Sequence, residues 1–91
     1  MEKYKVLIKP SAVKEIESIT TKKDRARIVR LISDLADNPR PSGCKKLSGA
    51  NRYRLRQGNY RIIYSIEDNN LVIHVVKVAH RKDVYRLSTA S

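Results

Sequence analysis

The chain has 91 residues, with 20 Lys or Arg against 9 Asp or Glu, so its formal net charge is +11 at pH 7. This length suits a single small domain, and a hydrophobic fraction of 41% argues against a disordered chain. One cysteine, Cys44, excludes an internal disulfide and a multi-cysteine zinc site, and two histidines make a structural metal unexpected. Residues 1–10 contain no long apolar stretch, which predicts no signal peptide or membrane span and a cytoplasmic location.

The first half of the chain predicts one strand and two helices. Residues 4–9 (YKVLIK) favour a strand that ends at Pro10, and Ser11 is placed to cap a helix. A threonine pair separates this helix from a longer one that runs to about Asp37, where Asn38-Pro39 stops it. Apolar residues at helical spacing give each helix one buried face: Ala12, Val13, Ile16 and Ile19 in the first, and Ile28, Val29, Ile32, Leu35 and Ala36 in the second.

The second half predicts three strands after a long loop. The loop covers residues 38–51, and the strands cover residues 51–56, 60–66 and 71–78, joined by short turns that favour antiparallel neighbours. The predicted fold is a single α+β domain over residues 1–91 with the order βααβββ. In it a two-helix hairpin packs on one face of a small, mostly antiparallel sheet, and a short C-terminal segment follows.

Alternation along the strands separates the two faces of the predicted sheet. Tyr60, Tyr64 and their apolar neighbours should lie under the helices, and His74 should be half-buried on that side, opposite in parity to Lys77. The other face should carry arginines from two strands and the C-terminal segment: Arg52, Arg54 and Arg56, then Arg61, then Arg81. Guanidinium groups that converge on an open sheet face favour a phosphate ligand. The alternative is that each arginine points separately into solvent.

The charge is unevenly distributed along the chain. Residues 38–66 contain no carboxylate but include Arg40, Lys45, Lys46, Arg52, Arg54, Arg56 and Arg61. Such a field attracts polyanions, either nucleic acid or an acidic protein. A generally solvated basic surface is the plainer interpretation, although ordinary surfaces mix both signs.

Two segments resemble a known protein family. The segments YRLRQGNYRIIY (53–64) and HRKDVY (80–85), together with the predicted element order, resemble the RelE/ParE superfamily of bacterial and archaeal toxins. The resemblance extends over residues 4–86, and the C-terminal segment is similar to the RelE branch. It implies an mRNA endoribonuclease that acts on the ribosome without a metal or other cofactor. In that reaction the 2′-hydroxyl attacks the adjacent phosphate and leaves a 2′,3′-cyclic phosphate.

The resemblance assigns roles to residues at the matching positions. It implies that Arg61 stabilises the transition state and that Arg81 holds the phosphate or approaches the leaving 5′-oxygen. Tyr85 is expected to stack on a base and to keep the 2′-oxygen in line. Where the best-known members carry lysines this chain has Arg52 and Arg54, and arginine does not lose its proton in proteins. Clamping of phosphate is therefore their expected role, shared with Arg56, Lys45 and Lys46.

His80 is then the candidate general base or acid, because histidine is the side chain that commonly exchanges protons near neutral pH. A loop histidine bonded to the backbone is the alternative for His80, and solvated loop lysines are the alternative for Lys45 and Lys46.

The resemblance also implies partners. We expect a cognate antitoxin in a hetero-oligomer with this chain, contact with the ribosome and mRNA, and no membrane. Two other functions remain open, a ParE-type inhibitor of DNA gyrase and a basic nucleic-acid-binding module without catalysis. The set His80, Arg81 and Tyr85 favours the nuclease, since a pure binder has no need of it.

Overall fold

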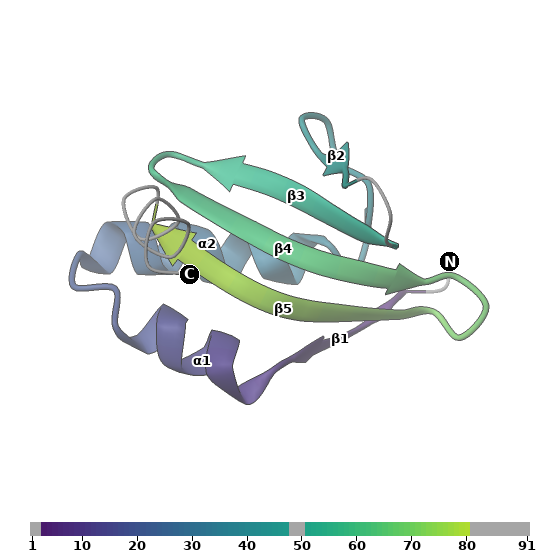
Figure 1. Ribbon diagram of the computed structural model, residues 1–91, viewed down its shortest axis with the longest axis horizontal. Helices are drawn as coiled ribbons and strands as arrows, with labels where there is room; N and C mark the ends of the chain where they lie inside the picture. The colour runs from purple at the N-terminus through teal and green to yellow at the C-terminus, as the bar shows by residue number, and fades with distance from the viewer. Residues whose placement is uncertain (1–2, 48–50, 81–91) are drawn as a thin grey trace.

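A computed structural model describes residues 3–47 and 51–80 of the chain. In these residues five strands and two helices follow one another (Figure 1), and their bounds are β1 (Lys5–Ile8), α1 (Pro10–Glu17), α2 (Lys22–Asp34), β2 (Lys45–Lys46), β3 (Arg52–Gln57), β4 (Tyr60–Glu67) and β5 (Val72–His80). The strands form one sheet in the order β1-β5-β4-β3-β2, with β1 parallel to β5 and the other pairs antiparallel. The predicted fold class is confirmed. The sequence did not predict β2, which lies in the long loop.

Helix α2 passes behind the strands in Figure 1, and α1 lies along β5, so the front of the sheet in this view is not covered by either helix. Helix α1 begins at Pro10 and not after Ser11, because the fixed φ of proline suits the first helical position and its missing N–H is not needed there. The core between helices and sheet is aliphatic apart from Tyr64, which is fully buried, and Tyr60 packs against it. The predicted core positions of both tyrosines are confirmed. No helix in residues 3–47 and 51–80 is long and apolar enough to cross a membrane.

The loop after α2 is fastened to the far end of β4 by one ion pair. Both terminal nitrogens of Arg40 donate to the Asp68 carboxylate, at 3.2 and 2.8 Å, and the Tyr4 hydroxyl donates to the same carboxylate at 2.7 Å. The Arg40 guanidinium also lies over the Tyr53 ring, 5.3 Å from its centroid. The hydrogen bonds from Arg40 and then from Tyr4 hold the pKa of Asp68 below its usual range. This network therefore joins the loop to β1, β3 and the β4–β5 turn.

A β-bulge in β5 changes which side chains face the helices. Tyr64 of β4 pairs with Val75, but the preceding residue of β4, Ile63, pairs with Lys77, so Val76 has no partner in the register. The extra residue places His74 and Lys77 on the same face of the sheet, the one that the helices leave open. His74 is paired there with Ser65, and Lys77 with Ile63. The prediction that His74 lies on the helix side, opposite in parity to Lys77, was therefore wrong, because simple alternation cannot represent a bulge; the side predicted for Lys77 was right.

Candidate functional site

Four arginines from β3 and β4 share the face of the sheet that the helices leave open. In the register, Arg52 lies opposite Ser65, Arg54 opposite Ile63, and Arg56 opposite Arg61, while Leu55 and Ile62 between them are buried under the helices. We call the open side of the sheet with Arg52, Arg54, Arg56 and Arg61 the arginine face. The predicted convergence of arginines from two neighbouring strands is confirmed for these four.

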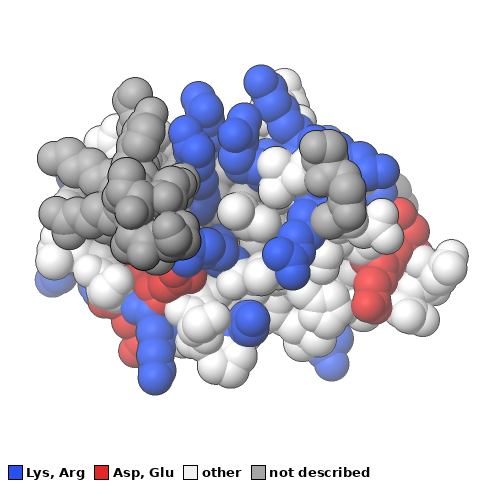
Figure 2. Space-filling model, viewed as in Figure 1, with Lys and Arg blue, Asp and Glu red and all other residues white. Residues whose placement is uncertain are grey.

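The charge of the arginine face is not neutralised within the described part of the chain. Among residues 3–47 and 51–80, the ion pairs involve Lys3, Arg40, His74 and Lys77, and none involves an arginine of this face. Figure 2, which views this face, shows Lys and Arg side chains gathered over β2, β3 and β4, whereas acidic side chains at the right lie where β4 turns into β5. Placing like charges directly across a strand pair is destabilising. The arrangement therefore favours an anionic ligand.

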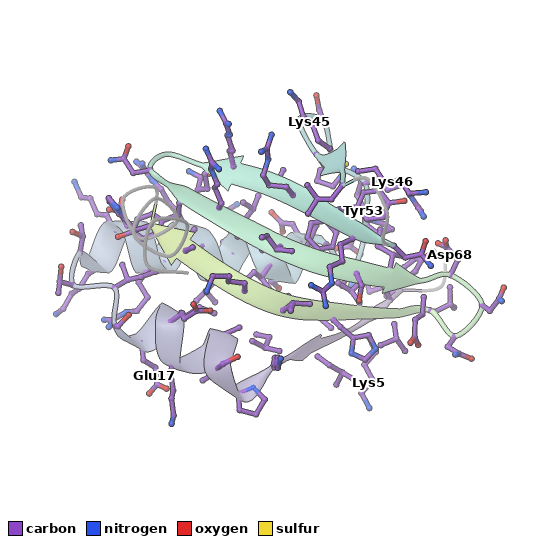
Figure 3. The ribbon with its side chains drawn as sticks, in the orientation of Figure 1. Lys5, Glu17, Lys45, Lys46, Tyr53 and Asp68 are labelled. Carbon is purple, nitrogen blue, oxygen red and sulfur yellow. The ribbon has the colours of Figure 1, made fainter. Side chains whose placement is uncertain are left out.

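The two lysines of β2 differ in their relation to this face. Lys45 pairs with Arg54 and so extends the arginine face by one strand, whereas Lys46 pairs with Tyr53, whose ring stacks on Tyr64 on the helix side. Both lysines are exposed, and Figure 3 shows them on β2, at the opposite end of the view from the helix residue Glu17. The structure thus brings Lys45 into the site, while Lys46 lies at its rim.

The C-terminal end of β5 lies beside Arg61. Arg61 pairs with Ala79, a small residue, and the next residue, His80, pairs with Tyr60. The rings of His80 and Tyr60 contact each other edge to face, with centroids 5.1 Å apart. The register therefore places His80 on the same side of the sheet as Tyr60, which is the helix side. Its neighbour in sequence, Ala79, lies on the open side with Arg61. Arg81 and Tyr85 lie outside the described residues.

Sequence reasoning did not include Lys77 among the site residues. Through the bulge, Lys77 lies opposite Ile63, and so in one row across the open face with Arg54 and Lys45. Its amino group donates to Glu15 of α1 at 2.9 Å. Alternation had already placed Lys77 on the side opposite to that predicted for His74, but no sequence signal pointed to Glu15 as its partner.

A comparison with models of protein families assigns the chain to a family. Residues 6–85 match the model described as the ParE toxin of the type II toxin–antitoxin system, parDE. The chain belongs to the RelE/ParE toxin superfamily. Within the superfamily it is similar to toxins of the RelE type, and the predicted membership is confirmed.

Three similar proteins show how far this likeness extends. A putative RelE-like toxin protein of Escherichia coli is 31% identical over 96% of this chain and 95% of its own length. Toxin RelE of Mycobacterium tuberculosis is 26% identical over 93% of this chain and 89% of its own length. The archaeal RelE–RelB complex from Pyrococcus horikoshii contains a chain with a TM-score of 0.77 and 32% identity, and the match covers 86% of this chain and 94% of that one. RelE-type toxins and this chain thus share one fold over most of its length.

Proposed function

We propose that this RelE-type toxin is a ribosome-dependent endoribonuclease that cuts mRNA and is neutralised by a cognate antitoxin. The observation that carries the proposal is the arginine face, on which Arg54, Arg56 and Arg61 adjoin one another without an ion-pair partner among the described residues. A single-stranded RNA backbone supplies phosphates at a spacing that such a surface can follow. Because ribosomes and mRNA are the proposed targets, the proposed location is the cytoplasm.

The proposed reaction needs fixed positive charge more than it needs a strong base. The 2′-oxygen loses its proton and attacks the adjacent phosphorus; the bond to the 5′-oxygen breaks, and that oxygen takes up a proton. The products are a 2′,3′-cyclic phosphate and a 5′-hydroxyl, and the intermediate carries extra negative charge on the phosphate oxygens. Arg61 is placed to stabilise this charge, and a preorganised cation is the kind of group that does so most effectively.

The other site residues are proposed to bind the RNA, hold the reacting phosphate or transfer a proton. Arg52, Arg54, Arg56 and Lys45 bind the RNA backbone on either side of the reacting phosphate, with Lys46 at the rim. Arg81 holds that phosphate, and Tyr85 stacks on a base and keeps the 2′-oxygen in line. His80 is the candidate for proton transfer, but its pairing with Tyr60 directs it to the helix side. The proposal therefore assigns the larger part of the rate to charge stabilisation.

A cognate antitoxin is the proposed protein partner. Structures similar to this chain include the M. tuberculosis toxin–antitoxin complex RelBE2, with 26% identity and a TM-score of 0.75, and the P. horikoshii RelE–RelB complex. An acidic or amphipathic segment that folds on binding would complement the net charge of +11. Covering the arginine face would block access of RNA, and the toxin and antitoxin would form a hetero-oligomer.

The deciding experiment adds the purified full chain to translating ribosomes and maps the ends of the mRNA. The proposal expects cuts within the codon in the decoding site, with 2′,3′-cyclic phosphate ends, and expects that an Arg61→Ala variant cuts far more slowly. Arg27, an exposed arginine of α2 on the other side of the molecule, provides the matched Arg27→Ala control. Intact mRNA and continued translation in the presence of the parent chain would refute the nuclease.

The second candidate is inhibition of DNA gyrase, and the description of the matching family model favours it. A gyrase inhibitor would stop negative supercoiling of relaxed plasmid DNA in the presence of ATP and would leave programmed ribosomes untouched. Running the two assays on the same preparation separates the candidates, because each predicts activity in one assay alone.

A further inference from the structure

The bulge in β5 places Lys77 on the same side of the sheet as His74. If the register of Tyr64 with Val75 continued without the bulge, Lys77 would lie opposite Ile62, which is fully buried under the helices. With Val76 unpaired, Lys77 lies opposite Ile63 on the open side, in line with Arg54 and Lys45. Bulges re-aim side chains in this way and are over-represented beside active sites. Lys77 is thus the cation that β5 adds to the arginine face.

Glu15 holds this lysine from the neighbouring helix. Strand β1 ends opposite Val75, so no strand among the described residues pairs with the later part of β5 on that side, and α1 packs along it (Figure 1). One carboxylate oxygen of Glu15 accepts from the Lys77 amino group at 2.9 Å, and the other accepts from the Val78 backbone N–H at 3.1 Å. Because its second oxygen is fixed to the backbone, Glu15 presents the first in a defined position.

The Lys77 amino group keeps capacity for a second partner. An ammonium group has three N–H donors, and one of them goes to Glu15. The side chain of Lys77 retains 35% of its exposure, compared with 29% for Glu15. Glu17, a second carboxylate of α1, points away from the sheet in Figure 3, so α1 directs one of these two acids toward β5 and the other into solvent.

We propose that Lys77 is a further RNA-contacting residue of the arginine face and that Glu15 is its positioning residue. The inference rests on the proposed function for its RNA substrate. In it the Lys77 ammonium donates to a backbone phosphate oxygen beside the one that Arg61 contacts, while Glu15 fixes where that ammonium lies. Lys77 contributes charge to binding, and Glu15 contributes geometry to the chemical step.

The binding test measures affinity for mRNA-programmed ribosomes as a function of salt. Lys77→Met removes the charge and keeps the length, so we expect affinity to fall roughly threefold to tenfold and the slope of log K against log salt to flatten by about 0.7–1, as for one lost phosphate contact. Lys77→Arg should retain the slope. Lys14→Met, which removes an exposed cation of α1, is the matched control and should change neither quantity. An unchanged slope in folded Lys77→Met overturns the contact.

The test of Glu15 uses single-turnover cleavage by the same preparations. Glu15→Gln keeps the Lys77 charge, so binding and its salt slope should be maintained while the cleavage rate falls several-fold. The loss should vanish when the same change is made in a Lys77→Met background, because Glu15 acts through Lys77. Glu17→Gln is the matched control and should cut like the parent. A Glu15→Gln loss that persists without Lys77 overturns the positioning role.

A variant that fails to fold must be distinguished from one that folds but has lost RNA binding or cleavage. Thermal unfolding of each variant shows whether it folds, and Lys77→Gln, which keeps a polar chain at this position, replaces Lys77→Met if the latter does not fold. A parent chain that binds programmed ribosomes but cuts nothing overturns the proposed nuclease. In that case the salt slope of the Lys77 variants still decides the RNA contact.

Discussion

Arg56 and Arg61 lie directly opposite each other on β3 and β4, on the side of the sheet that neither of the two described helices covers. Neither forms an ion pair with another described residue. Like charges at directly opposed sheet positions destabilise a protein. A pair that costs stability and has no internal partner is typical of a binding site, where stability is commonly sacrificed for function.

Removing one member of this pair should stabilise the protein. We expect Arg56→Thr to raise the free energy of unfolding by about 0.2–1 kcal/mol, because it relieves the repulsion and places a strand-favouring residue in β3. Urea unfolding at low salt measures the change, and binding to RNA should weaken in the same variant. Arg52→Thr is the matched control, because Arg52 lies opposite Ser65 and has no cation across the strand pair. Equal gains from both substitutions would show that strand propensity, and not repulsion, is responsible.

The lysines of β2 should contribute unequally to RNA binding. Replacing Lys45 and Lys46 together by Ala should lower affinity and flatten the salt dependence, since each phosphate neutralised releases a counterion. Most of the effect should come from Lys45, which pairs with Arg54, and little from Lys46, which pairs with Tyr53. Salt titrations of the two single variants check this, and the cleavage position should stay the same. Equal effects from the two lysines would mean that their register is irrelevant to binding.

Most helices and strands could be predicted, because the spacing of hydrophobic residues and the positions of turn-forming residues indicate the same element boundaries along most of this chain. Alternation in β3 and β4 fixed the arginine face correctly, since Leu55 and Ile62 must be buried and their neighbours then point outward. Alternation failed at Val76, because no sequence rule marks which valine of a run is left unpaired. The side of His74 was predicted wrongly for this reason, whereas the side of Lys77 was predicted correctly.

The long-range polar contacts could not be predicted from the sequence either. Arg40 and Asp68 are 28 positions apart, and Glu15 and Lys77 are 62 apart. Each pair has good geometry because helices and strands bring the residues together, and single residues carry no signal of such a partner. The basic segment 38–66 supplies the arginine face, but Arg40 in it bonds to Asp68 and is not part of that face.

The Arg40–Asp68 pair should make stability depend on pH in acid. The pKa of Asp68 is held below its usual range by Arg40 and Tyr4, so the contribution of this group to stability is present above an unfolded-state pKa of about 3.9 and is lost as pH falls below it. Asp68→Asn should therefore be less stable than the parent at pH 7, and the difference should shrink as pH falls toward 3. Urea unfolding across this range measures it. Arg40→Met should reproduce the effect without adding to it. A difference independent of pH would contradict the assignment.

The buried Tyr64 hydroxyl should contribute to stability through one hydrogen bond. It donates to the Pro39 backbone carbonyl at 2.9 Å and so ties the loop after α2 to the core, and burial raises the pKa of this hydroxyl. Tyr64→Phe leaves the carbonyl without this donor, and we expect a loss of about 1 kcal/mol in the free energy of unfolding. No loss in Tyr64→Phe would show that water replaces the donor at Pro39.

Fixed charge and proton transfer should be separable in the proposed cleavage reaction. Arg61→Ala removes a preorganised cation from the reacting phosphate, and we expect the chemical step to slow by roughly 10²–10³-fold, with a similar loss for Arg81→Ala. Tyr85→Phe should keep most of the rate if stacking is its role, whereas Tyr85→Ala should not. Single-turnover cleavage on programmed ribosomes measures all four variants. Parent-like rates in all of them would refute the roles assigned to Arg61, Arg81 and Tyr85.

His80 gives the last test, because its two possible roles predict different pH profiles. Its ring contacts Tyr60 edge to face, and the register places it on the helix side, whereas Arg61 faces the open side. If packing is its role, His80→Gln should lose stability and some rate but retain the shape of the pH–rate curve. If His80 transfers the proton, the variant should lose any rate dependence near pH 6–7. From the register we expect the first result. Measuring Tyr60→Leu in parallel provides the control, since it removes the ring that His80 contacts and leaves the imidazole in place. A flat profile in His80→Gln beside a parent-like profile in Tyr60→Leu would establish His80 as the proton-transfer group.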